Sequence, residues 1–231
     1  MLTFDATVLA QGDFRLSVDL SVSQGVTAVI GPSGAGKSTL LAAVAGFLEP
    51  RAGDILWNDA SVIGLPPGRR PVSMLFQDHN LFPHLTIGQN VGLGVRPDMR
   101  LDAQQRQVVE AALTEVGLQG FSDRKPGTLS GGQQSRAALA RVLVVDRPLV
   151  LLDEPFAALG PAMKAEMLQL VRQTLADAGK TVLMVTHDPT DAKAVADHVV
   201  MVADARADAP FPTEAIFADP PAALAAYLGQ E

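Results

Sequence analysis

The stretch GPSGAGKST, residues 31–39, decides the fold. It fits the pattern GxxxxGK(S/T), follows a short apolar run at 26–30 and precedes a helical run that carries Leu40, Leu41 and Val44. Glycines at these positions let backbone N–H groups surround a phosphate, and the positive end of the following helix adds to the attraction. A glycine-rich turn without a ligand is the alternative, but the strand–loop–helix context favours a nucleotide phosphate site, or P-loop.

The loop also predicts individual roles. Lys37 would reach the β- and γ-phosphates, and the Ser38 hydroxyl would ligate Mg²⁺. ATP and Mg²⁺ are therefore the expected ligands, although a P-loop alone leaves kinases, GTPases, motors and transport ATPases open. The predicted nucleotide-binding residues of the loop are Gly31, Pro32, Ser33, Gly34, Ala35, Gly36, Lys37, Ser38 and Thr39.

Composition limits the classes of protein that remain. The chain has 231 residues, 48% of them hydrophobic, which is enough for a substantial core. Its net charge of −7 argues against a nucleic-acid partner. No run approaches the length of a membrane span, and the N-terminus lacks the charged and apolar regions of a signal peptide. The absence of cysteine excludes disulfides, and we expect a cytoplasmic location.

Strands alternate with helices along the chain. Residues 14–22 alternate as a half-buried strand does, and the runs 149–152 and 182–185 are typical of buried parallel strands. Ile55 and Trp57 before Asn58-Asp59 indicate an antiparallel hairpin.

The fold class predicted from this pattern is α/β, a P-loop NTPase core with an antiparallel β subdomain and an inserted helical subdomain. We expect one domain, 1–231, with its core in 1–84 and 146–203 and a short tail in 204–231. The helical subdomain would occupy 85–145, where Asp102 and Gln105 could cap a helix.

Polar side chains follow several of the apolar runs. Asp153 and Glu154 end one predicted strand, His187 follows another, and Gln77 follows the run 72–76. Ligands bind beyond the carboxyl ends of parallel strands, so Asp153 would hold Mg²⁺ through water and Glu154 would polarise an attacking water. Each residue alone has a structural alternative: a helix cap for the acids, a structural role for His187 and a surface position for Gln77.

The stretch TLSGGQQ, residues 128–134, poses a separate question. Ser130 and Gln133 have the spacing of a capping box, yet the helix would then begin with Gly131 and Gly132. Each glycine costs up to about 1 kcal/mol relative to alanine. Either the chain bends tightly at this point, or a ligand must come close to bare backbone.

The motifs GPSGAGKST, Gln77, LSGGQ, VLLDEP and VTHD, in this order, resemble the nucleotide-binding subunit of an ABC transporter over about residues 2–200. The resemblance implies a homodimer in which Ser130, Gly131, Gly132 and Gln133 of one subunit face the ATP of the other. That arrangement would explain the two glycines by ligand approach.

The same resemblance implies the site and the partners. The catalytic residues would be Glu154, His187, Lys37 and Gln77, and the metal ligands would be Ser38, Gln77 and Asp153. Two membrane-spanning permease domains would be driven by the ATPase pair, with a periplasmic substrate-binding protein acting through the permease. The subunit would be peripheral, on the cytoplasmic face of the bacterial inner membrane, and would bind no nucleic acid.

The chain departs from the family pattern at three places. The family usually has an adenine-stacking aromatic near the start of the chain, whereas Phe14 is in phase with Leu16 and Val18 and is expected in the core. Gly160 stands where the family commonly has an aspartate. The signature continues QSRAALAR, through Arg136 and Arg141, instead of QRQRVALAR. With these departures we expect normal nucleotide binding but altered coupling between the two sites.

The transported substrate follows only from closer resemblance. PPGRRPVSMLFQDHNLFPHLTIGQNVGLGV, residues 66–95, is similar to the ATPases of bacterial thiamine and thiamine pyrophosphate importers. Molybdate, sulfate, polyamine or iron import is the alternative, and GVTAVIGPSGAGKS is molybdate-like. Many of those relatives carry a C-terminal domain that 204–231 is too short to build. A non-transport ABC ATPase would usually have fused cassettes, a coiled coil or basic extensions, and a small-molecule kinase has no use for LSGGQ.

Overall fold

A mixed β-sheet organises the computed structural model, which describes residues 1–77 and 80–229. The strand order is β5-β4-β1-β2-β10-β9-β3-β8-β7-β6, and β11 pairs with β9. The strands are β1 (Leu2–Gln11), β2 (Phe14–Val22), β3 (Gly25–Ile30), β4 (Ala52–Trp57), β5 (Ala60–Ser61), β6 (Val72–Leu75), β7 (Leu149–Asp153), β8 (Thr181–Val185), β9 (His198–Ala203), β10 (Arg206–Ala207) and β11 (Phe211–Pro212). The helices are α1 (Lys37–Ala45), α2 (Ile87–Val95), α3 (Ala103–Glu115), α4 (Gly131–Val145), α5 (Pro161–Val171), α6 (Pro189–Val195), α7 (Thr213–Ala218) and α8 (Ala222–Tyr227), with short helical turns at Pro67–Arg69, Pro126–Thr128 and Arg172–Ala176.

The parallel part of the sheet consists of β9, β3, β8, β7 and β6. Residues 149–152 of β7 and all of β8 are buried because side chains pack on both faces of these strands, as their apolar runs predict. The carboxyl ends of β3, β7 and β8 meet at one edge of the sheet. That edge therefore receives the P-loop, the acidic pair after β7 and the histidine after β8.

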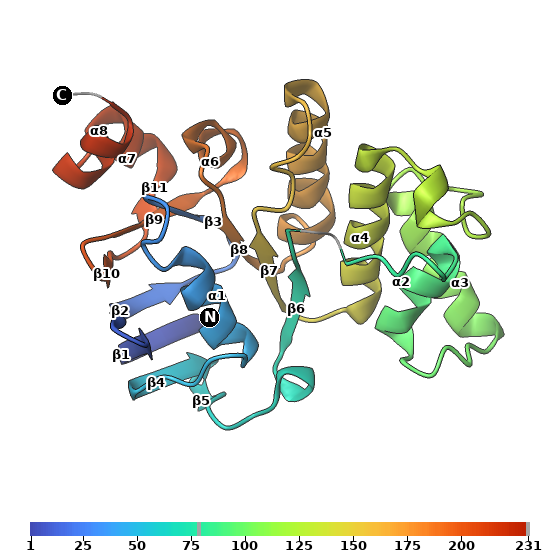
Figure 1. Cartoon of the computed structure of the whole chain (residues 1–231), viewed down its shortest axis with the longest axis horizontal. Coiled ribbons are helices and arrows are strands. Elements are labelled where there is room, and N and C mark those ends of the chain that lie inside the picture. The colour runs from blue at the N-terminus through green and yellow to red at the C-terminus, as the bar shows by residue number, and fades with distance from the viewer. Residues whose placement is uncertain (78–79, 230–231) are drawn as a thin grey trace.

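The antiparallel part lies beside α1 and consists of β1, β2, β4 and β5 (Figure 1). Alternate residues of β2 are buried in one apolar cluster with α1, which confirms the half-buried strand. Asn58 and Asp59 adopt positive φ angles of 47° and 64°, as a two-residue hairpin turn requires. The predicted hairpin is thus confirmed.

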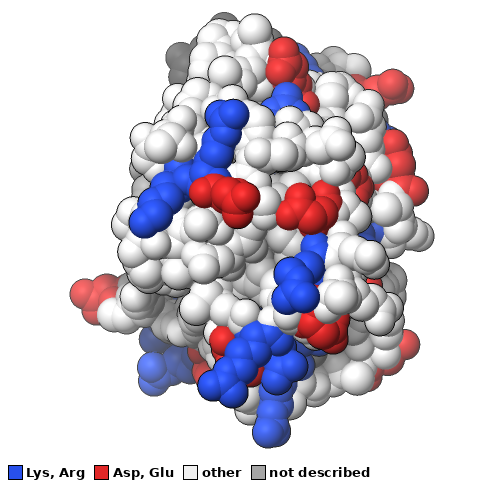
Figure 2. Space-filling model, turned by 90° about the vertical axis from the view of Figure 1, so that its right-hand side faces the viewer, with Lys and Arg blue, Asp and Glu red and all other residues white. Residues whose placement is uncertain are grey.

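Three helices, α2, α3 and α4, pack together at the far end of the molecule from the N-terminal strands (Figure 1). Asp102 and Gln105 form the predicted capping box of α3, and Val109, Ala112 and Leu113 are buried on its inner face. The outer face of this end carries lysine and arginine side chains interspersed with acidic ones (Figure 2). The division of the chain into subdomains stays a prediction.

The C-terminal segment packs onto the core. β10 pairs with both β2 and β9, and β11 adds to β9. Ile216 of α7 and Leu224 of α8 are 2% and 0% exposed, which anchors both helices. Within the described residues, no helix combines the length and the apolar character that crossing a bilayer requires.

Candidate functional site

A cavity of about 600 Å³ opens where β3 leads into α1. Its volume is in the range of about 300–1,000 Å³ that is typical of small-molecule sites. Most of the lining belongs to the P-loop, and residues from both ends of the chain complete it. The lining residues are Gln11, Phe14, Gly31, Ser33, Gly34, Gly36, Lys37, Ser38, Thr39, Glu154, His187 and Tyr227.

The P-loop adopts a conformation that only glycine tolerates at two positions. Gly36 is the N-cap of α1 with φ of 105°, and a Cβ there would come within 2.5 Å of the Phe14 ring. Gly31 has φ of 151°, and its Cβ would overlap the carbonyl oxygen of Val202. No side chain caps the first turn of α1, so the N–H groups of this turn are available to a phosphate.

Lys37 supplies the positive charge of the cavity. Its Nζ donates to the carbonyl oxygens of Gly31 and Pro32, each at 2.8 Å, and the residue is only 7% exposed. Burial lowers the pKa of Lys37, while the carboxylates of Glu154 and Asp153 act in the opposite direction. The Lys37 ammonium is therefore bonded to its own loop and interacts with the acidic pair through charge alone.

Asp153 ends β7 beside the first turn of α1. Its Oδ1 accepts a hydrogen bond from Ser38 Oγ at 3.2 Å. Burial raises the pKa of Asp153, the bond from Ser38 lowers it, and the nearby charge of Glu154 raises it further. A desolvated carboxylate of this kind favours a cation close by.

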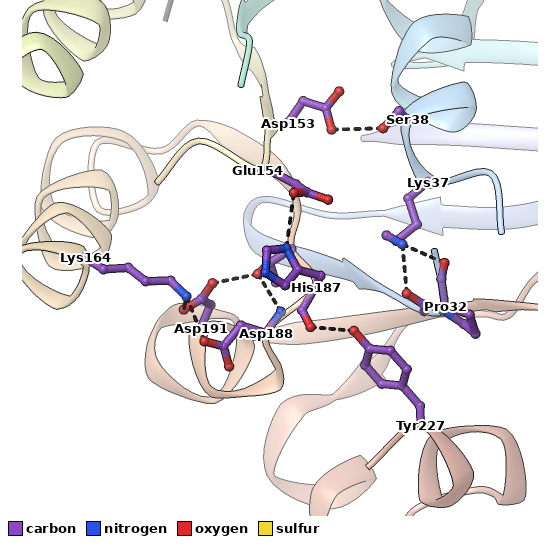
Figure 3. Close-up of polar contacts among 12 residues, drawn as sticks. Pro32, Lys37, Ser38, Asp153, Glu154, Lys164, His187, Asp188, Asp191 and Tyr227 are labelled. Atoms are coloured by element: carbon purple, nitrogen blue, oxygen red, sulfur yellow. Dashed lines mark hydrogen bonds and ion pairs between the residues drawn. The ribbon is translucent and has the colours of Figure 1, made fainter. Parts of the chain in front are cut away.

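Glu154 and His187 both line the cavity, and their side chains point toward each other, as Figure 3 shows. Glu154 Oε2 lies 3.1 Å from His187 Nδ1. Glu154 has a φ of 44°, a left-handed conformation that costs a non-glycine residue about 1–3 kcal/mol. Such strain concentrates at functional sites, and the strained residue here is one whose carboxylate lines the cavity.

A polar network holds the segment around His187. Thr186 Oγ1 donates to Asp191 Oδ2 at 2.6 Å and accepts from the backbone N–H of Asp188 at 3.1 Å. Lys164 of α5 bridges Asp188 and Asp191, each at 2.7 Å (Figure 3). The bonds from Lys164 and Thr190 lower the pKa of Asp188 to about 2. Sequence reasoning missed this network because its members have no motif spacing.

The signature stretch lies outside the cavity. Ser130 and Gln133 form the predicted capping box: the Ser130 N–H donates to Gln133 Oε1 at 3.0 Å, and the Gln133 N–H donates to Ser130 Oγ at 3.4 Å. Among the described residues, none from 130–133 lines the cavity. Gln77 is also absent from the lining, and its side chain is exposed after β6.

Phe14 corrects one expectation. Its ring is only partly buried: it packs against the apolar cluster below and lines the cavity above the P-loop. The alternation with Leu16 and Val18 is real, but Phe14 is the first residue of β2, beside the cavity, and is less buried than the alternating residues that follow it. The expectation of a core residue is therefore wrong in part.

Gln11 and Tyr227 are lining residues that sequence reasoning missed. Gln11 ends β1, and Tyr227 reaches the cavity from α8, near the opposite end of the chain. Tyr227 is the only tyrosine in the sequence, but no spacing relates it to the P-loop.

Comparison with known proteins assigns the chain to a family. Residues 16–157 match the model of the ABC transporter family. The chain belongs to the ABC transporter family. It is 60% identical to a thiamine import ATP-binding protein of Cereibacter sphaeroides over 99% of the chain and 100% of that protein. It is 50% identical to a protein of the same name from Vibrio cholerae, over 88% of the chain and 86% of that protein.

Solved structures of ABC proteins have the same fold. A component of an ABC transporter complex from Clostridium perfringens matches 94% of this ABC chain and 90% of its own, at 28% identity and a TM-score of 0.82. A dimeric ATP-binding cassette with ADP and phosphate, in a post-hydrolysis state, matches 92% of this chain and 99% of its own, at 27% identity and a TM-score of 0.78. The predicted fold class, an ABC-type P-loop core, is confirmed.

Gly160 is the N-cap of α5 and makes no side-chain cap. A Cβ there would meet nothing within 4 Å. In this ABC chain the local fold therefore leaves room for the aspartate that the family commonly has.

Proposed function

We propose that this chain is the ATP-hydrolysing subunit of an ABC importer and that the importer carries thiamine or thiamine pyrophosphate. The observation that carries the ATPase proposal is the convergence of the P-loop, Asp153, Glu154 and His187 at one edge of the sheet. The names of the relatives support the substrate, since they describe thiamine import ATP-binding proteins at up to 60% identity.

The residues divide the chemistry among them. Loop N–H groups and Lys37 bind the phosphates and orient the γ-phosphate for in-line attack. Glu154 accepts a proton from the attacking water, and its hydrogen bond to His187 holds the two side chains together at 3.1 Å. His187, 58% exposed and at the cavity wall, donates to the γ-phosphate as negative charge develops on it.

Ser38 and Asp153 fit Mg²⁺. Both supply oxygen atoms, which Mg²⁺ prefers, and the two oxygens are 3.2 Å apart. When bound, Mg²⁺ neutralises charge on the β- and γ-phosphates. Gln77 would join only if its exposed side chain turned inward.

A second copy of the chain completes the proposed site. Ser130 to Gln133 do not line the cavity of their own chain, and the N-terminus of α4 can approach a phosphate because Gly131, its first residue, presents backbone without a side chain. The similar cassette with ADP and phosphate is dimeric, which supports the participation of a second copy.

The permease would dock on a groove of about 350 Å³ between α1, β6 and α4. Phe47, Phe76 and Phe82 line it, and Phe47 and Phe82 are 60% and 46% exposed. Exposed aromatic side chains of this kind mark interaction surfaces. This docking would hold the chain at the cytoplasmic face of the membrane, with the substrate-binding protein acting on the far side through the permease.

Deletion of the gene in a thiamine auxotroph tests the substrate. Uptake of labelled thiamine should fall to background, while uptake of labelled molybdate should remain. A plasmid that carries the wild-type chain should restore thiamine uptake, and one that carries Glu154→Gln should not. Undiminished thiamine uptake combined with lost molybdate uptake would overturn the assignment and favour its rival.

A further inference from the structure

The C-terminal helix α8 forms part of the wall of the nucleotide cavity. Leu224 is fully buried in the main core, and Leu228 packs against the same cluster. This anchoring brings Tyr227 to the cavity lining, beside Glu154 and His187. A segment that follows the last long strand of the sheet thus touches the reaction site.

Tyr227 makes one specific bond there. Its hydroxyl donates to the main-chain carbonyl oxygen of His187 at 2.5 Å (Figure 3). The His187 side chain is 58% exposed, and among the described residues the ring makes one side-chain hydrogen bond, to Glu154. The ring position therefore depends on how firmly the backbone of residue 187 is held.

Two elements hold that backbone from opposite sides. On one side, Lys164 and the side chains of Asp188, Asp191 and Thr186 fix the residues that flank His187. On the other side, Tyr227 fixes the carbonyl of His187 itself. Without the Tyr227 bond, the segment would be held only on the other side, through the Lys164 network and the bond from the Thr186 N–H to the Val29 carbonyl oxygen at 3.2 Å.

We propose that Tyr227 is a positioning residue for ATP hydrolysis, which fixes His187 against the γ-phosphate and makes the C-terminal helix a working part of the nucleotide site. This inference rests on the proposed ATPase function. Burial raises the pKa of Tyr227, and the charges of Asp188 and Glu154 raise it further, so the hydroxyl remains a donor at neutral pH.

Steady-state ATP hydrolysis by the full-length chain tests the proposal with two variants. Tyr227→Phe removes only the hydroxyl and keeps the ring. Thr213→Val is the matched control, because Thr213 Oγ1 donates to the carbonyl of Ala196 at 2.7 Å in the same C-terminal segment but lines no part of the cavity. Thermal unfolding of both variants shows whether they are folded.

We expect Tyr227→Phe to lower kcat about three- to tenfold, the equivalent of one hydrogen bond, with KM for ATP within about twofold. Inhibition by vanadate, which mimics the transferring phosphoryl group, should weaken by the same factor, because His187 contacts that group. Thr213→Val should lower the unfolding temperature and leave kcat unchanged.

Tyr227→Phe with wild-type kcat would overturn the inference and leave the ATPase proposal intact. Equal losses of kcat in both variants would also overturn it, since they would show a purely structural role. A wild-type chain that neither binds nor hydrolyses ATP would instead refute the proposed function. Absorbance gives an independent readout when the ATP-induced difference spectrum of Tyr227→Phe is subtracted from that of the wild type, which removes the contributions of Trp57 and ATP. A tyrosine band should remain, and its absence would contradict the place of Tyr227 in the site.

Discussion

Gly131 is the first residue of α4, and replacing it by alanine separates folding from function. Its φ is not positive, and an added Cβ would meet only a Leu159 methyl at 3.8 Å, an ordinary contact. The monomer therefore does not need glycine at this position. Alanine should stabilise the helix by up to about 1 kcal/mol. For a domain of this size that raises the unfolding temperature by up to about 2–4 °C.

The same methyl group should damage catalysis. If a partner's ATP lies against the bare backbone of α4, the Cβ pushes the γ-phosphate away and weakens one hydrogen bond to a charged group. Such a bond is worth about 1.5–3 kcal/mol, which corresponds to a rate loss of about 10- to 150-fold. The chain should therefore become more stable and less active at once.

Thermal unfolding and steady-state ATP hydrolysis by the full-length chain measure the two effects. Gly68→Ala is the matched control, since a Cβ at Gly68 meets nothing within 4 Å and the residue lines no part of the cavity. Gly132→Ala is less informative because its Cβ would overlap the Met163 side chain. Wild-type turnover in Gly131→Ala would refute the idea that ligand approach explains the glycine at position 131.

Three other changes have defined outcomes. Glu154→Gln should keep ATP binding and lower turnover by at least about 10²-fold, the contribution of a general base, and a phosphate-release assay showing near-normal turnover would remove that role. Arg70→Leu should lower the free energy of unfolding by at least about 2 kcal/mol, because fully buried Arg70 donates to main-chain carbonyls at the end of α1. Arg69 is exposed, so Arg69→Leu should change the free energy of unfolding little, and denaturant titration measures both variants. Asp188→Asn should lower the unfolding temperature at neutral pH. Folding lowers the pKa of Asp188 from 3.8 to about 2. The ionised Asp188 therefore stabilises the folded state above pH 3.8, and this stabilisation is lost as the pH falls toward 2. The difference in unfolding temperature between Asp188→Asn and the wild type should disappear over that pH range. A difference that stays constant would contradict the role of the Lys164 bridge.

Local patterns in the sequence predicted the parts of the fold that depend on neighbours in the chain. The apolar runs at 149–152 and 182–185 and the capping boxes at Asp102 and Ser130 depend on burial and hydrogen bonding within one element. Periodicity and spacing record such interactions directly. The sequence also predicted that one edge of the sheet carries the P-loop, Asp153, Glu154 and His187, because the carboxyl ends of parallel strands lie at the same edge.

Contacts between distant segments left no such pattern. Tyr227 meets His187 across 40 residues, and Lys164 meets Asp188 across 24. Arg70 looks like a surface residue in the run GRRP, yet it is fully buried against α1. Phe14 has the phase of a core residue, but its position at the start of β2 exposes the ring to the cavity. These placements follow from tertiary packing, which no local spacing encodes.

The mass of the Glu154→Gln chain in solution tests most directly whether ATP binds between two copies of the chain. Sedimentation with MgATP should give twice the 24.2 kDa of one chain, and sedimentation with ADP should give a single copy. Adding Gly131→Ala to the same chain should return it to a single copy with MgATP. A single-copy mass with MgATP, or a dimer that Gly131→Ala leaves unchanged, would contradict the binding of ATP between the P-loop of one copy and the signature of the other.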